Sequence, residues 1–91
     1  MASQQLRFVI ANPQVQKDLD KNKIPAEQIY GKLDHLCQSP QVALDPQYRL
    51  KYKTGFYKVR VGSYRIIYTF DSQQQILVVT NIDLRDQVYK K

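Results

Sequence analysis

The feature that most limits the fold is a stretch of alternating side chains that Gly62 and Ser63 interrupt. Residues 56–61 and 64–70 alternate with the period of two that is typical of β-strands. Glycine at the first position of a two-residue loop permits a type II′ turn, so the stretch predicts a tight β-hairpin. In this register Arg60 lies directly opposite Arg65.

The same register divides the hairpin into two faces, because successive side chains of a strand point in opposite directions. The apolar face is the expected core face and holds Tyr57, Val59, Val61, Tyr64, Ile66 and Tyr68. The other face holds Lys58, Arg60 and Arg65. Like charges opposite each other destabilise a strand pair, so the two arginines either extend into water or receive an anion together. Phosphate is the candidate anion, since arginine binds its oxygens in a bidentate way.

The rest of the chain predicts helices first and strands afterwards. Asn12 is a good helix N-cap, Pro13 is tolerated at the first helical position, and Ile29, Leu33 and Leu36 form one apolar helix stripe. The expected elements are a strand over residues 6–11, a helix over 13–22, a helix from Pro25 that ends by Ser39-Pro40, a loop over 40–49 anchored by Leu44, the hairpin, a turn over 71–75, a central strand over 76–82 and a short strand or extended tail over 87–90.

These elements predict one α+β domain over residues 1–91. An N-terminal strand and a short helical hairpin would pack on a mainly antiparallel, twisted sheet of about four strands. The segment 76–82 is rich in β-branched residues and apolar except at Thr80 and Asn81, which suits a central strand that is covered on both faces.

Composition excludes several functional classes. One cysteine, Cys37, and one histidine, His35, cannot form a Cys/His zinc site or an internal disulfide. Cys37 is expected to be buried in the helix stripe and His35 to lie on the surface or in helix packing. Three glycines are too few for a glycine-rich phosphate loop. The longest apolar runs have four residues and no secretory signal is recognisable, so we expect a cytoplasmic protein.

The net charge of +6 comes entirely from the second half of the chain. Residues 1–45 hold five basic and five acidic side chains, whereas residues 46–91 hold nine basic and three acidic ones. A one-sided positive field favours an anionic partner, and nucleic acid is the first candidate. A basic protein without such a partner is the alternative.

Further candidates lie on both sides of the hairpin. Lys51 and Lys53 alternate around Tyr52 and would either extend the basic face or remain solvated surface lysines. Arg85 and Tyr89 lie four residues apart near the end of the chain. Either a turn after Ile82 brings Arg85 back toward the basic face, or Arg85 is an ordinary surface residue and Tyr89 packs on the edge of the sheet. Aromatic residues of the preceding loop either stack on bases or anchor that loop on the core; they are Tyr48, Tyr52 and Phe56.

These residues resemble the RelE/ParE toxin superfamily. The similarity is carried by the stretch from Gly55 to Tyr68, with its basic alternation, Gly-Ser turn and Tyr-Arg pair, and by the ending Arg85-Asp86-Gln87-Val88-Tyr89. The resemblance covers roughly residues 5–90 and implies the α+β fold described above. It also implies a cognate antitoxin that covers the basic face with an acidic or amphipathic segment.

The resemblance further implies ribosome-dependent cleavage of mRNA in the A site, without a metal or other cofactor. The RNA's own 2′-OH would attack the adjacent phosphate. Lys58 and Arg60 match the basic pair of RelE-type enzymes, and Arg65 would hold the scissile phosphate. Tyr89 would orient or deprotonate the 2′-OH, and Arg85 would stabilise charge or protonate the leaving oxygen. Lys51, Lys53, Lys90 and Lys91 would add attraction for RNA.

The sequence departs from this family pattern at Asp83 and Leu84, where many members have glycine and then histidine or another polar residue. Leu84 cannot act as an acid or base, and an ion pair of Asp83 with a neighbouring arginine would weaken the positive field. Two alternatives therefore stay open, namely a ParE-type toxin that binds gyrase without cleaving nucleic acid and a catalytically degenerate binding protein.

Overall fold

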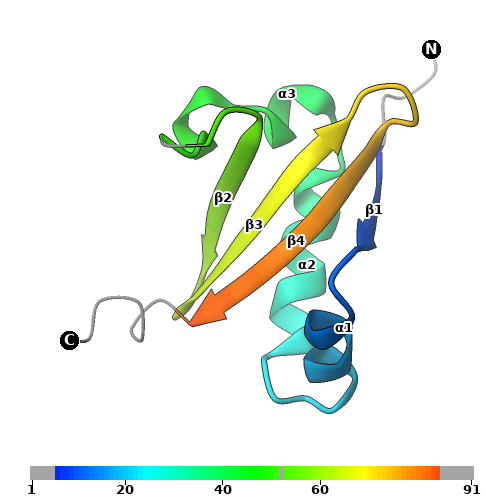
Figure 1. Ribbon diagram of the computed structural model, residues 1–91, viewed down its shortest axis with the longest axis vertical. Helices are drawn as coiled ribbons and strands as arrows, with labels where there is room; N and C mark the ends of the chain where they lie inside the picture. Colours follow the sequence, from blue (N-terminus) through cyan, green and yellow to red (C-terminus); the bar gives the residue numbers. More distant parts are fainter. Residues whose placement is uncertain (1–5, 52, 85–91) are drawn as a thin grey trace.

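The computed structural model describes residues 6–51 and 53–84. Its elements are β1 (Arg7–Ile10), α1 (Pro13–Asp20), α2 (Ala26–Leu36), α3 (Pro40–Ala43), a 3-10 turn (Pro46–Tyr48), β2 (Phe56–Val61), β3 (Tyr64–Asp71) and β4 (Ile76–Leu84) (Figure 1). The strands form one sheet in the order β1-β4-β3-β2. Among the described strands only β1 and β4 run parallel, so the predicted α+β fold with a mainly antiparallel four-stranded sheet is confirmed. The tail predicted over residues 87–90 lies outside the described residues.

The β2–β3 hairpin has the register that the sequence predicts. Val61 pairs with Tyr64, and Arg60 pairs with Arg65. Gly62 has a φ of 57°, in the region that favours glycine. The expected core face is also confirmed, because Val59, Ile66 and Tyr68 are buried and its remaining members pack against the core.

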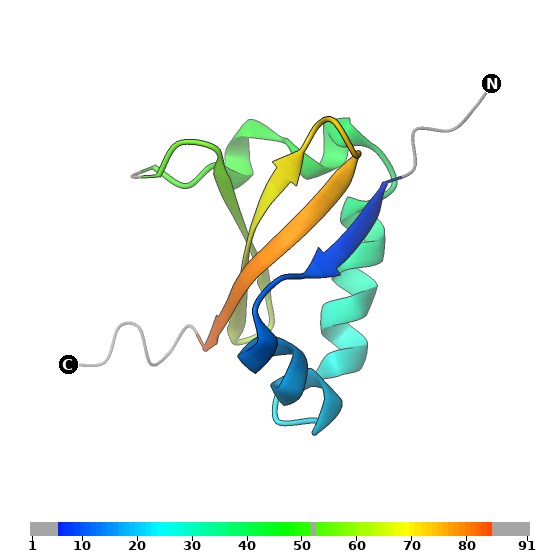
Figure 2. The same cartoon turned by 45° about the vertical axis from the view of Figure 1, so that its right-hand side comes forward.

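The helices lie on one side of the sheet, with α2 running behind the strands in Figure 1 and standing to one side of them in Figure 2. The Asn12 side chain accepts a hydrogen bond from the Gln14 N–H at 2.9 Å, as expected of an N-cap. Helix α1 ends at Asp20, earlier than predicted, because Asn22 has a left-handed φ of 59° that no α-helix continues. Within the described residues, no helix is long and apolar enough to span a membrane.

The prediction of a loop over residues 40–49 is wrong for most of its length. Ser39 caps α3 by accepting a hydrogen bond from the Val42 N–H at 3.3 Å. Asp45 caps the 3-10 turn in the same manner, through the Gln47 N–H. Each cap precedes a proline, which suits the first helical position, and this repeated pattern is what the loop prediction missed. Leu44 does pack against the core, as predicted.

Strand β4 is central, but the expectation that both of its faces are covered is not met by the described residues. Leu77 and Val79 are fully buried against the helical layer. Ile76 and Val78 alternate with them, are only half-buried and point to the face that no described helix covers. The sheet therefore has one core face and one open face.

Tyr68 joins the sheet to the segment that leads into it. Its ring is fully buried and stacks on Tyr57, with the ring centroids 5.6 Å apart. Its hydroxyl donates a 2.6 Å hydrogen bond to the Ala43 carbonyl at the end of α3. Burial raises the pKa of this hydroxyl well above its usual range, so it stays protonated at neutral pH.

Replacing Tyr68 by Phe should lower the free energy of unfolding by about 1–2 kcal/mol, because the Ala43 carbonyl would lose its buried donor. Tyr30→Phe is the control, since Tyr30 is half-buried and stacks on Phe8 without a described hydroxyl hydrogen bond. Urea unfolding followed by circular dichroism measures both. Equal effects of the two variants would contradict this role of the hydroxyl.

Two glycine-to-alanine changes should have opposite signs. Gly62→Ala forces a Cβ into a left-handed conformation and should cost about 1–2 kcal/mol of unfolding free energy. Gly31 is exposed within α2, and a Cβ built there meets nothing within 4 Å, so Gly31→Ala should stabilise by about 0.5–1 kcal/mol. Urea unfolding of both variants beside the unchanged chain checks the signs, and a stabilising Gly62→Ala would refute the turn assignment.

Candidate functional site

Three basic side chains predicted as site residues come from the β2–β3 hairpin. Lys58 and Arg60 lie on β2, and Arg65 lies opposite Arg60 on β3. The tight turn determines the face of the sheet on which all three lie, because a register shift of one residue would move each side chain to the other face. Arg60 is exposed, and Lys58 is half-buried. The hairpin therefore presents the like-charged pair that the sequence predicts.

Arg65 is not free to act as an open cation, because it has an acidic neighbour on β4. Asp83 pairs with Arg65 in the β3–β4 register, and its Oδ2 lies 4.0 Å from the Arg65 Nη2. The Arg65 side chain is 13% exposed, and its buried Nε has no hydrogen-bond partner among the described residues. Asp83 thus offsets the repulsion between Arg65 and Arg60 and reduces the positive field at the centre of the sheet.

Lys58 and Arg60 instead line a groove along β2, which we call the β2-edge groove. It consists of two adjoining hollows of ≈ 500 and ≈ 480 Å³ that share Lys32 and Arg60. Both volumes fall within the range of about 300–1,000 Å³ that is usual for ligand sites. Its basic side chains are Lys32, Arg49, Lys51, Lys58 and Arg60, and none of its lining residues is acidic.

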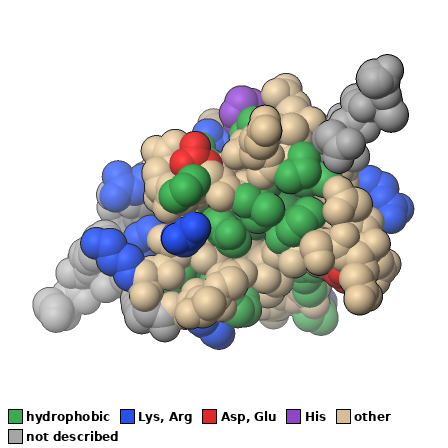
Figure 3. Space-filling model, turned by 90° about the horizontal axis from the view of Figure 1, so that it is seen from above, with side chains coloured by type: hydrophobic (Ala, Val, Ile, Leu, Met, Phe, Trp, Pro, Cys, Tyr) green, Lys and Arg blue, Asp and Glu red, His purple; other side chains and the backbone are tan. Residues whose placement is uncertain are grey.

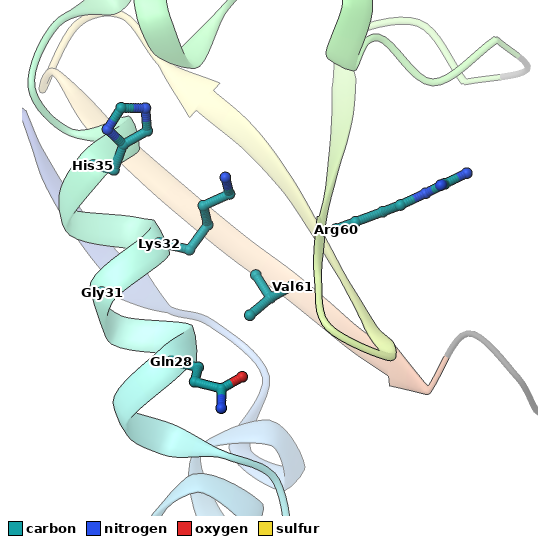
Figure 4. Close-up of a pocket in the computed structure, with 6 residues that line it drawn as sticks. All are labelled: Gln28, Gly31, Lys32, His35, Arg60 and Val61. Carbon is teal, nitrogen blue, oxygen red and sulfur yellow. The ribbon is translucent and has the colours of Figure 1, made fainter.

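The wall of the groove opposite β2 is formed by α2. Figure 4 shows Lys32 projecting from α2 toward the strand, whereas Arg60 points away from the helix. His35, which we expected on the surface, is exposed at this wall. Seen from above, the Lys and Arg side chains gather mainly on the side of the molecule where β2 lies (Figure 3). The groove therefore collects positive charge from elements that are far apart in the sequence.

Sequence reasoning missed Lys32 and Arg49 as members of this group. Lys32 precedes Leu33 of the buried helix stripe, so it lies beside the core face of α2, where it can approach the edge strand. Arg49 forms an isolated antiparallel bridge with Tyr57, which holds it beside β2. The alternation of Arg49, Lys51 and Lys53 was a usable signal for Arg49. No signal in the sequence shows that β2 would be an edge strand beside α2.

The candidate site residues of the loop before β2 do not all lie in the groove. Lys51 lines the β2-edge groove as predicted for the basic face, but Lys53 does not. The Lys53 Nζ lies 4.4 Å from the centroid of the Phe56 ring, over which it forms a cation–π contact. Tyr48 packs against the core, in agreement with the anchoring alternative. Tyr52 lies outside the described residues.

The C-terminal candidates Arg85, Tyr89, Lys90 and Lys91 also lie outside the described residues. The last residue of β4, Leu84, pairs with Tyr64 beside the hairpin turn. The described part of the chain holds no group of three or more His, Cys, Asp or Glu side chains placed to bind a metal ion. Burial, and to a smaller extent the charge of Asp34, raises the pKa of Cys37 to about 11. This core thiol is therefore not a nucleophile at neutral pH.

The chain is similar in structure to known toxins. It matches an arginine double mutant of Escherichia coli toxin RelE in the free state with a TM-score of 0.67 and 20% identity, covering 94% of this chain and 87% of that one. The archaeal RelE–RelB complex from Pyrococcus horikoshii matches with a TM-score of 0.62 and 19% identity, over 89% of this chain and 96% of that one. The toxin–antitoxin complex RelBE2 from Mycobacterium tuberculosis matches with a TM-score of 0.58 and 23% identity, over 93% of this chain and 94% of that one. At these identities the likeness shows a shared fold.

The sequence comparisons identify the family. Among curated proteins none matches the chain. Residues 9–89 match the family described as "ParE toxin of type II toxin-antitoxin system, parDE". This match spans most of the 91 residues and agrees with the RelE-like fold. The chain therefore belongs to the ParE toxin family and is a type II toxin–antitoxin toxin of the RelE/ParE superfamily.

Proposed function

We propose that this toxin inhibits translation as an endoribonuclease that cuts mRNA in the A site of the ribosome. The observation that carries the proposal is the position of Lys58 and Arg60 on β2 next to Arg65 on β3, in a sequence that continues to Arg85 and Tyr89. Within the described residues, neither Lys58 nor Arg60 makes an ion pair. Both are therefore available to an RNA phosphate.

In the proposed reaction the 2′-oxygen of the RNA forms a bond to the adjacent phosphorus, and the bond from that phosphorus to the 5′-oxygen breaks. The 2′-OH loses its proton and the leaving 5′-oxygen gains one, so the products are a 2′,3′-cyclic phosphate and a 5′-OH. Negative charge grows on the phosphorane, where Lys58, Arg60 and Arg65 would stabilise it. Tyr89 would orient or deprotonate the 2′-OH, and Arg85 would stabilise charge or protonate the leaving oxygen.

The remaining parts of the proposal concern where the reaction occurs and what binds the toxin. The proposed reaction occurs in the cytoplasm, where ribosomes translate, and its substrate is ribosome-bound mRNA. A cognate antitoxin is the second partner, since two of the similar structures are complexes of a toxin with its antitoxin. Lys51 and Lys53, with Lys90 and Lys91, would add long-range attraction for RNA.

A second candidate function is binding and poisoning of DNA gyrase without cleavage of nucleic acid. The match to the ParE toxin family favours it. The ion pair of Arg65 with Asp83 also favours it, because that pair opposes the use of Arg65 on a phosphate. A binding toxin would not need the basic cluster and Tyr89 to act together.

Primer extension on an mRNA translated in vitro should show cuts that need both ribosomes and the toxin. Arg65→Ala should reduce cleavage by about 100-fold or more, as expected when a group that stabilises transition-state charge is lost. Lys17→Ala is the matched control, since Lys17 is exposed on α1 away from the hairpin. Absence of cuts by folded protein, or full cleavage by Arg65→Ala, would overturn the proposal. A gyrase supercoiling assay would then test the second candidate.

Removing the acid beside Arg65 should strengthen RNA binding. Asp83→Asn should tighten binding of a fluorescein-labelled single-stranded RNA about threefold or more, because the Arg65 charge becomes available. Glu27→Gln makes the same change of charge at an exposed site on α2 and should have a smaller effect. In an Arg65→Ala background, Asp83→Asn should tighten RNA binding by no more than Glu27→Gln does. An equal gain in both backgrounds would show that Asp83 acts only through net charge.

A further inference from the structure

A β-bulge in β4 changes which face its last residues occupy. The β3–β4 ladder pairs Tyr68 with Val79 but Ile67 with Asn81, so Thr80 is one extra residue in β4. Thr80 and Asn81 therefore follow each other on the same face, where both line one hollow with Ile67. Beyond this point each side chain of β4 points to the face opposite to the one that unbroken alternation would give. Bulges are common beside functional sites, where they redirect a side chain.

The bulge brings Asp83 to the open face of the sheet. If the register before the bulge continued, Asp83 would lie opposite Tyr64 on the core face, and a carboxylate buried there would lose its solvation. With the extra residue, Ile82 lies opposite the buried Ile66 and packs against the core. Asp83 lies opposite Arg65. The same irregularity therefore completes the core and places a carboxylate beside an arginine of the proposed site.

Asp83 completes a row of three charged residues across the open face. Arg60 of β2 pairs with Arg65 of β3, which pairs with Asp83 of β4. Neighbouring strands lie about 4.8 Å apart, so a phosphate held by the two arginines has Asp83 on its β4 side. The Asp83 side chain is 32% exposed, and its Oδ2 lies 4.0 Å from the Arg65 Nη2, which is longer than a direct hydrogen bond. The carboxylate therefore keeps lone pairs for a substrate hydroxyl.

Other proton acceptors among the described residues lie away from this row. The described strands hold one further acid, Asp71, which is six residues from Arg65 along β3, or about 20 Å. His35 is exposed on α2, on the side of the sheet opposite to the open face (Figure 2). Lysine and arginine side chains donate hydrogen bonds and do not accept them. Asp83 is therefore the proton acceptor that the described residues offer at this site.

We propose that Asp83 is the general base of the cleavage reaction. This inference rests on the proposed function and assigns one proton transfer within it. As the 2′-oxygen bonds to phosphorus, its proton passes to the Asp83 carboxylate, and the carboxylic acid returns that proton to water after the cyclic product leaves. Tyr89 would then orient the 2′-OH, and the leaving 5′-oxygen takes its own proton from Arg85 or from water.

Proton transfer to Asp83 also releases Arg65. Before the reaction, the carboxylate offsets part of the Arg65 charge. A protonated Asp83 is neutral, so the full charge of Arg65 becomes available while negative charge grows on the phosphorane. This gain occurs in the transition state and not in the bound substrate, which is the condition for a higher kcat. An Asp83 that served only as a counter-ion would instead slow nothing when it is removed.

Single-turnover cleavage of ribosome-bound mRNA at saturating toxin separates these two roles. Asp83→Asn should lower the cleavage rate about 100-fold or more, as expected for a missing general base, although it tightens RNA binding. Asp34→Asn makes the same change at an exposed position of α2 and should keep the rate within about twofold. Asp83→Glu keeps a carboxylate and should cut at least about tenfold faster than Asp83→Asn. Thermal unfolding of each variant checks that it is folded.

A modified mRNA identifies the direction of the proton transfer. Sulfur in place of the bridging 5′-oxygen at the cleavage site gives a thiolate leaving group, which departs without being protonated because thiols are far more acidic than alcohols. A variant that lacks the general acid should regain its rate on this RNA. Asp83→Asn should stay about 100-fold slower than the unchanged chain, because the 2′-OH still has to lose its proton.

Three results would overturn the role of Asp83. They are cleavage by Asp83→Asn at the rate of Asp34→Asn, no faster cleavage by Asp83→Glu than by Asp83→Asn, and recovery of Asp83→Asn on the sulfur-containing mRNA. The first would leave Asp83 as a counter-ion, and the last would make it the general acid. The unchanged chain reports separately on the proposed function. If it does not cut, that function and this role both fail, whereas equal cutting by the unchanged chain and Asp83→Asn removes only this role.

Discussion

The arrangement of charge in this toxin depends on a two-residue turn. Gly62 and Ser63 fix the pairing of β2 with β3, and a slip of one residue would exchange the core face with the open face. The same turn buries Val59 and Ile66 and places Arg60 opposite Arg65. Folding therefore forces two like charges together, and β4 supplies Asp83 where it offsets them. The core and the basic cluster are two consequences of one register.

The sequence predicts the parts of the fold that have strong local signals. The strand alternation, the turn and the Asn12 cap suffice for the hairpin register and for the start of α1. Short capped helices are harder to predict, because Ser39-Pro40 and Asp45-Pro46 resemble loop sequences unless the cap is recognised. The site is predicted only in part, since Lys32 and Arg49 reach β2 through tertiary packing and an isolated bridge. No local pattern encodes which strand lies at the edge of a sheet.

Asp83 shows how a departure from a family pattern changes a site without changing the fold. It pairs with Arg65 across the β3–β4 ladder, so the sheet keeps its register while the central arginine loses free charge. The cations that stay unpaired lie at the β2 edge, on three separate segments of the chain. Positive field is thereby shifted from the middle of the sheet toward its edge. A bound phosphate would have to compete with Asp83 for Arg65, but not for Arg60.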